Sequence, residues 1–275
     1  MTSSASSPQR AIRGNFLNSP LKGQWADASQ WQRYWQLSSH WCFGQIQSAM
    51  VDYDIHPPFY FWVLHIWFVL FGVSLVSALV LNLVVVCLTA VIIYVTCRVL
   101  AVSSTLSFLA TLAWTVSLPS RTAVSVIRQY SLFTMFTAAL LLVAVLWLQK
   151  KQLRYLVTLC VVLVVGGVLT HFQFPIPAAV TVALVAAILW RRRSVREIAQ
   201  LGLAVVVAAV AFYVVEPGFM ESVWRAREQA QSFTFPQLFQ RAGAIIPTAL
   251  QLFNPLDWSH PLPYGLLDWA QPSTW

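Results

Sequence analysis

Residues 75–97 read LVSALVLNLVVVCLTAVIIYVTC, a continuous apolar run without a charged side chain. The run is about as long as the ~20 residues that a helix needs to cross the hydrocarbon core of a bilayer. Inside a bilayer every backbone N–H and C=O group must be hydrogen-bonded within the protein, so such a run has to be helical. The sequence therefore predicts a transmembrane helix here. The alternation typical of outer-membrane strands is absent.

The composition extends this prediction to the rest of the chain. Of the 275 residues, 58% are hydrophobic and only 9% are charged, whereas a soluble domain carries about 25% charged residues. Further runs without a charged side chain occupy 104–119, 132–148, 155–170, 174–190 and 198–215. We therefore expect an all-α, polytopic transmembrane bundle, with six spans at about 75–98, 104–119, 129–148, 154–170, 174–190 and 197–215.

The net charge of +8 indicates an orientation in the membrane and not a nucleic-acid partner, because the basic residues cluster at the ends of the apolar runs. Alternation of six spans puts most of them on one side: Arg98, Lys150, Lys151, Arg154, Arg191, Arg192, Arg193 and Arg196. The opposite connections carry only Arg121 and Arg128. The positive-inside rule makes the first side cytoplasmic. Of the nine acidic residues, only Glu197 falls on that side.

This topology divides the chain into three parts. Residues 1–72 form an extracytoplasmic region, residues 73–215 the transmembrane domain, and residues 216–275 an outer tail. The apolar stretch 57–71 is short for a span and rich in aromatic side chains, which favours a juxtamembrane helix along the outer face. A seventh span there would put the arginine triplet outside. Because no span or signal peptide precedes the outer N-terminal region, we expect the chain to be truncated, with an incomplete tail.

Polar residues at the membrane edge gather on the outer side in this topology. They form four groups: Asp52, Asp54 and His56; Arg121, Arg128 and Tyr130; Thr170 and His171; and Arg225, Arg227 and Glu228. A carboxylate can act as a general base or hold a metal, and arginine binds phosphate in a fork geometry. This chemistry favours a substrate with a phosphate head and a lipid tail. Plainer readings stay open: Asp54 as a helix cap, Arg128 extending to the interface, and His171 as a hydrogen-bonding helix end.

Three motifs resemble those of a known superfamily. Residues 54–67 read DIHPPFYFWVLHIW and are followed by Phe71-Gly72. This stretch resembles the D-x-H-P-P-L-Y-Y-x-x-L-H-x-W…F-G block of GT-C fold, lipid-linked-sugar glycosyltransferases, which include protein O-mannosyltransferases and aminoarabinose transferases. Residues 128–132 (RQYSL) resemble the R-x-Y-x-L motif, and residues 169–172 (LTHF) the Y-T-H-Y/F segment. The resemblance covers about residues 50–190, with the motifs in the same order and at comparable separations.

The resemblance implies an integral membrane enzyme that uses a polyprenyl- or dolichyl-phosphate sugar as donor. Such enzymes pass the sugar to an acceptor on the extracytoplasmic side, with inversion at the anomeric carbon. The expected location is the plasma membrane, the inner membrane in a bacterium, with the site facing outward. Neither the sugar nor the acceptor can be read from the sequence. A divalent metal is compatible with the carboxylates, although no ligand spacing requires one.

The resemblance also suggests site residues. The family's acidic W-x-D-E pattern is altered here, because Trp25-Ala26-Asp27-Ala28 keeps Trp and Asp but lacks Glu. Asp27 and Asp54 are therefore the two candidates for the catalytic base. Arg128 is the candidate for the donor phosphate. The other substrate-binding candidates are His56, Tyr130 and His171.

Other functions stay open. A non-catalytic GT-C relative would explain the altered acidic motif. A transporter or flippase-like protein is a second class, and a structural membrane subunit is a third. A transporter should carry ionisable residues at mid-depth in its spans. The runs found here are apolar at mid-depth, with Asn82 near an outer end, which favours a site at the membrane surface.

Overall fold

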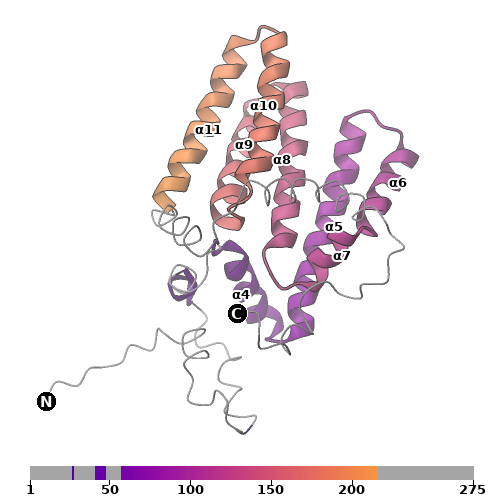
Figure 1. The fold of residues 1–275 in the computed structure, drawn as a ribbon, viewed down its shortest axis with the longest axis vertical. Coiled ribbons are helices and arrows are strands. Elements are labelled where there is room, and N and C mark those ends of the chain that lie inside the picture. The colour runs from indigo at the N-terminus through magenta and orange to yellow at the C-terminus, as the bar shows by residue number, and fades with distance from the viewer. Residues whose placement is uncertain (1–26, 28–40, 48–56, 216–275) are drawn as a thin grey trace, which may run out of the picture.

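The computed structural model describes residue 27 and residues 41–47 and 57–215, and this part of the chain is all-α, without a strand. The predicted fold class is therefore confirmed (Figure 1). Within residues 57–215 the helices are α4 (Phe59–Phe71), α5 (Leu75–Val99), α6 (Ser104–Thr115), α7 (Leu118–Ser125), α8 (Tyr130–Lys150), α9 (Leu153–Val164), the π-helix η2 (Val165–Thr170), α10 (Pro175–Arg191) and α11 (Val195–Val215).

Three of these helices, α5, α8 and α11, are long and apolar enough to cross a membrane by themselves. The others are shorter. The predicted span at 154–170 consists of α9 and η2 in direct succession. The expected span at 104–119 is interrupted, since α6 ends at Thr115 and α7 begins at Leu118. The extended backbone of Ser117 and a proline in the first turn of α7 separate the two helices.

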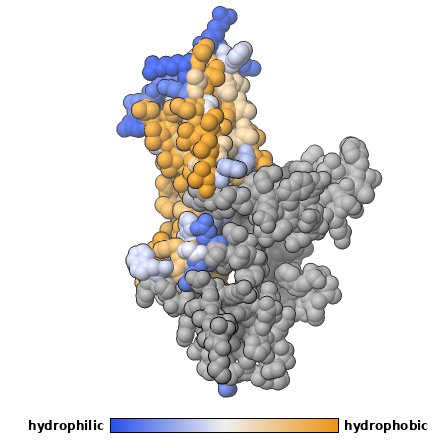
Figure 2. Space-filling view, turned by 90° about the vertical axis from the view of Figure 1, so that its left-hand side faces the viewer, coloured by the Kyte–Doolittle hydropathy of each residue, from blue (hydrophilic) through white to orange (hydrophobic). Residues whose placement is uncertain are grey.

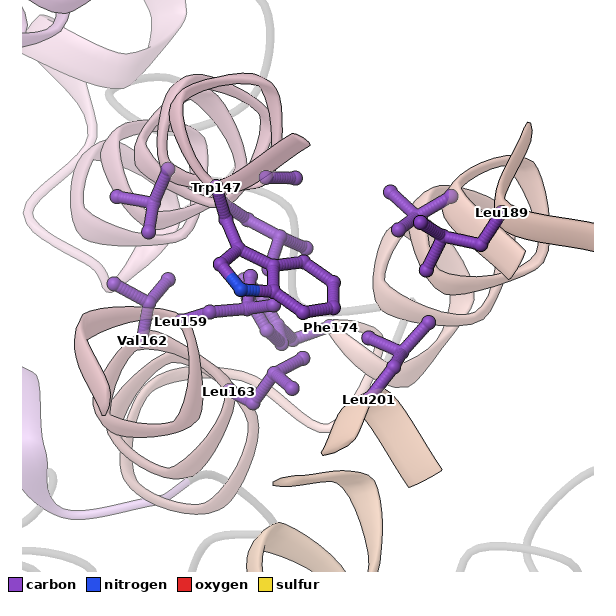
Figure 3. Packing of buried hydrophobic residues seen from close by; sticks show 11 residues of the cluster. Trp147, Leu159, Val162, Leu163, Phe174, Leu189 and Leu201 are labelled. Atoms are coloured by element: carbon purple, nitrogen blue, oxygen red, sulfur yellow. The ribbon is translucent and has the colours of Figure 1, made fainter. Parts of the chain in front are cut away.

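The bundle has two apolar cores. The larger lies among α8, α9, α10 and α11 around Trp147, which is almost completely buried (Figure 3). The smaller joins α4 to α5 and the first turns of α8. Apolar side chains also cover much of the exposed helix surface (Figure 2). That surface suits contact with lipid tails, and the chain is an integral membrane protein.

The basic turns lie together at one end of the bundle, at the top of Figure 1. There Lys151 at the end of α8 forms an ion pair with Glu197 at the start of α11, with 3.5 Å between the charged atoms. The side-chain amide of Gln149 donates a hydrogen bond of 2.9 Å to the carbonyl of Val99, which joins the ends of α8 and α5. The alternation expected from the sequence is thus present. Which compartment this end faces stays a prediction.

Helix α4 lies at the opposite end and packs against α5. It begins directly after two prolines, close to the predicted start of the juxtamembrane helix at residue 57. It ends at Gly72, whose φ of 84° is a conformation that favours glycine. The indole N–H of Trp67 donates a 2.9 Å hydrogen bond to the carbonyl of Ser77 and anchors α4 to α5. The three-part domain division remains a prediction, since residues 1–26 and 216–275 lie outside the described residues.

Candidate active site at the start of helix α8

Asn82 is the central polar residue at this end of the bundle, and it is completely buried. Its side-chain oxygen accepts hydrogen bonds from the hydroxyls of Tyr60, 3.1 Å away, and Ser131, 3.0 Å away. Its side-chain nitrogen donates to the carbonyls of Val124, at 3.3 Å, and Val126, at 2.9 Å. Every donor and acceptor of the carboxamide is therefore used. Asn82 ties α5 to α4, to the end of α7 and to the start of α8.

The turn between α7 and α8 carries Arg128. Its backbone N–H donates a 2.8 Å hydrogen bond to the carbonyl of Val126, the same carbonyl that accepts from Asn82. The Arg128 side chain is exposed. The buried polar network thus fixes the backbone of the turn, while the guanidinium of Arg128 stays accessible to a ligand.

His171 lies beside the first turn of α8. Its ring is 5.7 Å from that of Tyr130 and 5.0 Å from that of Phe133, centroid to centroid. The backbone N–H of Gln173 donates a 3.1 Å hydrogen bond to His171 Nδ1, so the proton of the neutral imidazole is on Nε2. His171 is 7% exposed and Tyr130 is 38% exposed. Two motifs about forty residues apart therefore meet at one end of the bundle.

The π-helix η2 sets the position of His171, which directly follows it. Its first glycine, Gly166, accommodates the ring of Phe174, because a Cβ at Gly166 would lie 2.6 Å from a Phe174 ring carbon. Phe174 in turn packs edge-to-face on Phe133, with the ring centroids 6.4 Å apart. Short π-helical segments are frequent at functional sites. Here the segment brings the chain close to α8 just before His171.

Gln129, between Arg128 and Tyr130, is the residue that the sequence did not single out. It is completely buried. Neither its side-chain oxygen nor its side-chain nitrogen has a hydrogen-bond partner among the described residues, and although Gln129 is the N-cap residue of α8, its side chain makes no capping bond. An unpaired buried polar group costs about 1–3 kcal/mol. The amide atoms of Gln129 thus contrast with the fully paired amide of Asn82.

The H-P-P block mainly holds α4 in place. The Tyr60 hydroxyl donates a hydrogen bond to the side chain of Asn82, and the Trp67 indole donates one to the Ser77 carbonyl. The Nε2 atom of buried His65 lies 3.5 Å from the sulfur of Cys42. Burial raises the pKa of the Tyr60 hydroxyl, and a hydroxyl that donates to the neutral Asn82 oxygen has to keep its proton. The Tyr60 hydroxyl therefore stays protonated and can donate.

The six predicted site residues fare differently. The structure brings Tyr130 and His171 together and places Arg128 on the turn that leads into Tyr130. Asp27 is exposed, and Asp54 and His56 lie outside the described residues. Within 57–215 the one acidic residue is Glu197, at the other end of the bundle. A catalytic carboxylate would have to come from outside that range, and no three metal-binding side chains gather among the described residues.

Comparison with known protein families identifies a family for this chain. A family model described as dolichyl-phosphate-mannose-protein mannosyltransferase matches residues 55–215, more than half of the chain. The matched range begins next to His56 and includes the Asn82 network, Arg128, Tyr130 and His171. No curated protein and no solved structure matches the chain.

Proposed function

The chain belongs to the dolichyl-phosphate-mannose-protein mannosyltransferase family, and from this premise we propose that it uses a polyprenyl-phosphate-linked sugar at the start of α8. As a family member it is a membrane glycosyltransferase of the mannosyltransferase type. We further propose that the acceptor binds on the extracytoplasmic face of the plasma membrane. The acceptor is a hydroxyl or an amine.

One observation carries this proposal. An exposed arginine, Arg128, lies next to the Tyr130–His171 pair at the end of the bundle opposite the basic turns. A lipid phosphate sits at the membrane edge, with its tail among the helices and its charge at the surface. Arginine matches the oxygens of a phosphate with two parallel N–H donors. The apolar helix surface beside this end suits the lipid tail.

The proposed reaction is a single displacement at the anomeric carbon. The acceptor oxygen or nitrogen attacks from the side opposite the phosphate, so the configuration inverts. The bond between the anomeric carbon and the phosphate oxygen breaks, and the lipid phosphate leaves with the electron pair. Asp54 or Asp27 takes the proton of the acceptor. Arg128 neutralises the charge that grows on the leaving phosphate, and Tyr130, His56 and His171 bind the donor head group.

A non-catalytic relative is the second candidate, and a specific observation favours it. Residues 57–215 supply no carboxylate at this end of the bundle, since Glu197 lies at the other end. Without a working base at Asp27 or Asp54, the chain would bind the donor but not transfer the sugar. This candidate keeps the same donor site.

A transfer assay separates the two candidates. Membranes carrying the full chain are supplied with dolichyl phosphate mannose labelled in its mannose, and label incorporated into membrane acceptors is measured. We expect the wild type to transfer the label. Replacement of the acid that acts as the base, by Asp54→Asn or Asp27→Asn, should lower the transfer rate at least tenfold, which corresponds to about 1.4 kcal/mol in activation free energy. Glu197→Gln is the control, because Glu197 is an acid at the other end of the bundle. Full transfer by the Asp27→Asn/Asp54→Asn double variant would exclude both acids as the base.

A further inference from the structure

The amide of Gln129 is a buried polar group at this end of the bundle that the proposed function does not use. Its side chain is completely buried, and both of its polar atoms lack a partner among the described residues. Buried amides in folded proteins are normally paired, and an unpaired one calls for an explanation. A leucine of similar size would fill the same space without that penalty. The choice of glutamine therefore points to a ligand.

The chemistry of a carboxamide selects that ligand. Its oxygen accepts hydrogen bonds and its NH₂ group donates them. A phosphate without protons only accepts, so it satisfies one half of the amide. A pair of neighbouring sugar hydroxyls both donates and accepts, so it satisfies both halves. The unpaired atoms of Gln129 thus match a sugar better than they match the lipid phosphate.

The position of Gln129 agrees with this match. It directly follows Arg128, and consecutive Cα atoms are about 3.8 Å apart. A sugar joined to phosphate through its anomeric oxygen carries its nearest hydroxyls next to that phosphate. Gln129 also lies one helical turn before Phe133, on the same face of α8, and the Phe133 ring contacts His171. The Arg128 side chain is exposed and that of Gln129 is buried, so the sugar of a donor whose phosphate binds Arg128 has to extend inward from the surface to meet the Gln129 amide.

We propose that Gln129 is the residue of this chain that recognises the sugar of the lipid-linked donor, by hydrogen bonds from its amide to two neighbouring hydroxyls. The inference rests on the proposed function. Gln129 is enclosed in the structure, so the sugar reaches it when the surrounding side chains move aside. The hydrogen bonds that the Gln129 amide forms with the sugar favour this movement of the surrounding side chains. Arg128 binds the phosphate and Gln129 binds the sugar, so the two contributions are separable.

The test compares two probes with the full-length protein in lipid nanodiscs. Affinities are measured for dolichyl phosphate, which has no sugar, and for dolichyl phosphate mannose. We expect Gln129→Leu to bind dolichyl phosphate like the wild type and to bind the mannose form about tenfold more weakly, as loss of one to two neutral hydrogen bonds implies. We expect Arg128→Ala to weaken both probes. The control is Gln152→Leu, an exposed glutamine that precedes α9 without capping it, with no effect on either probe.

Thermal unfolding of the free protein gives a second readout. Gln129→Leu removes two unpaired buried polar atoms, so we expect its midpoint to equal or exceed that of the wild type. A lower midpoint together with equal weakening of both probes would assign Gln129 a structural role and overturn the inference. Unchanged binding of both probes by Gln129→Leu would also overturn it, since buried water would then be the partner. If Arg128→Ala changed neither affinity, the proposed function itself would fail.

Discussion

The hydroxyl of Tyr60 donates a hydrogen bond to the side-chain oxygen of Asn82, 3.1 Å away, inside the protein and between α4 and α5. Through Asn82 the same network reaches the backbone of the turn that carries Arg128. Helix α4 and the proposed phosphate-binding turn are thus linked by one side chain. Changes at Asn82 should therefore affect both stability and the donor site.

Replacing Asn82 by leucine tests this link. The change removes the Asn82 hydrogen bonds of the Tyr60 and Ser131 hydroxyls and of the Val124 carbonyl, while the Val126 carbonyl keeps its bond from the Arg128 N–H. We expect a loss of about 2–4 kcal/mol in the free energy of unfolding, since several buried polar groups become unpaired. Thermal unfolding in detergent measures it. Thr89→Val is the control on the same helix, because the buried Thr89 hydroxyl bonds only its own helix, at the Val85 carbonyl. Equal stability losses for the two variants would contradict the assigned role of Asn82.

The Tyr60 hydroxyl also predicts a pH dependence. Its pKa in the folded protein is raised above the ordinary value of 10.0 by burial. In the unfolded chain Tyr60 ionises as the pH passes that ordinary value, whereas in the folded protein it stays protonated. Its contribution to stability is therefore fully present below the ordinary pKa and declines as the pH rises above it. We expect Tyr60→Phe to remove this part of the alkaline decline, measured as the unfolding midpoint between pH 9 and 11. An identical decline in both proteins would assign it to other groups.

The close approach of the Phe174 ring to Gly166 predicts that a larger residue at position 166 destabilises the protein. A methyl group there would meet the ring of Phe174 at 2.6 Å and 2.8 Å. We expect Gly166→Ala to destabilise the protein by about 1–3 kcal/mol, because the ring has to shift in a packed core. It should also weaken donor binding, since η2 positions His171. Gly202→Ala is the control in α11, where an added Cβ meets no atom within 4 Å. This control should be neutral or slightly stabilising, and a neutral Gly166→Ala would show that Phe174 moves freely.

In the predicted orientation, the end of the bundle with the α7–α8 turn faces outward and the end with the basic turns faces the cytoplasm. A cysteine introduced at exposed Ser125, at the end of α7, should react with a membrane-impermeant maleimide in intact cells. A cysteine at exposed Arg192, in the basic turn after α10, should react only after permeabilisation. The wild type, with its own four cysteines, gives the background. The reverse pattern would place the proposed site on the cytoplasmic side.

The sequence predicted the helices better than the site. The bounds of α5 and α8 follow from run length, because an apolar run of spanning length has to form a helix. The break at Ser117 was missed, since it depends on local backbone geometry within an uncharged run. The meeting of Tyr130 and His171 was expected from the alternation of spans. The partners of Asn82 were not, because two are backbone carbonyls that only tertiary packing brings near. Gln129 gave no signal, since its unpaired amide is visible only once its burial is known.

The central claim is that the donor phosphate binds at the Arg128 turn. Its most direct test is transfer of labelled mannose from dolichyl phosphate mannose by membranes that contain equal amounts of wild type, Arg128→Ala or Arg193→Ala. Arg193 lies exposed in the basic turn at the other end of the bundle. We predict that Arg128→Ala lowers the rate at least tenfold, as loss of a charge-assisted bond of about 1.5–3 kcal/mol implies, while Arg193→Ala keeps the wild-type rate. Equal rates for Arg128→Ala and the wild type would contradict the claim.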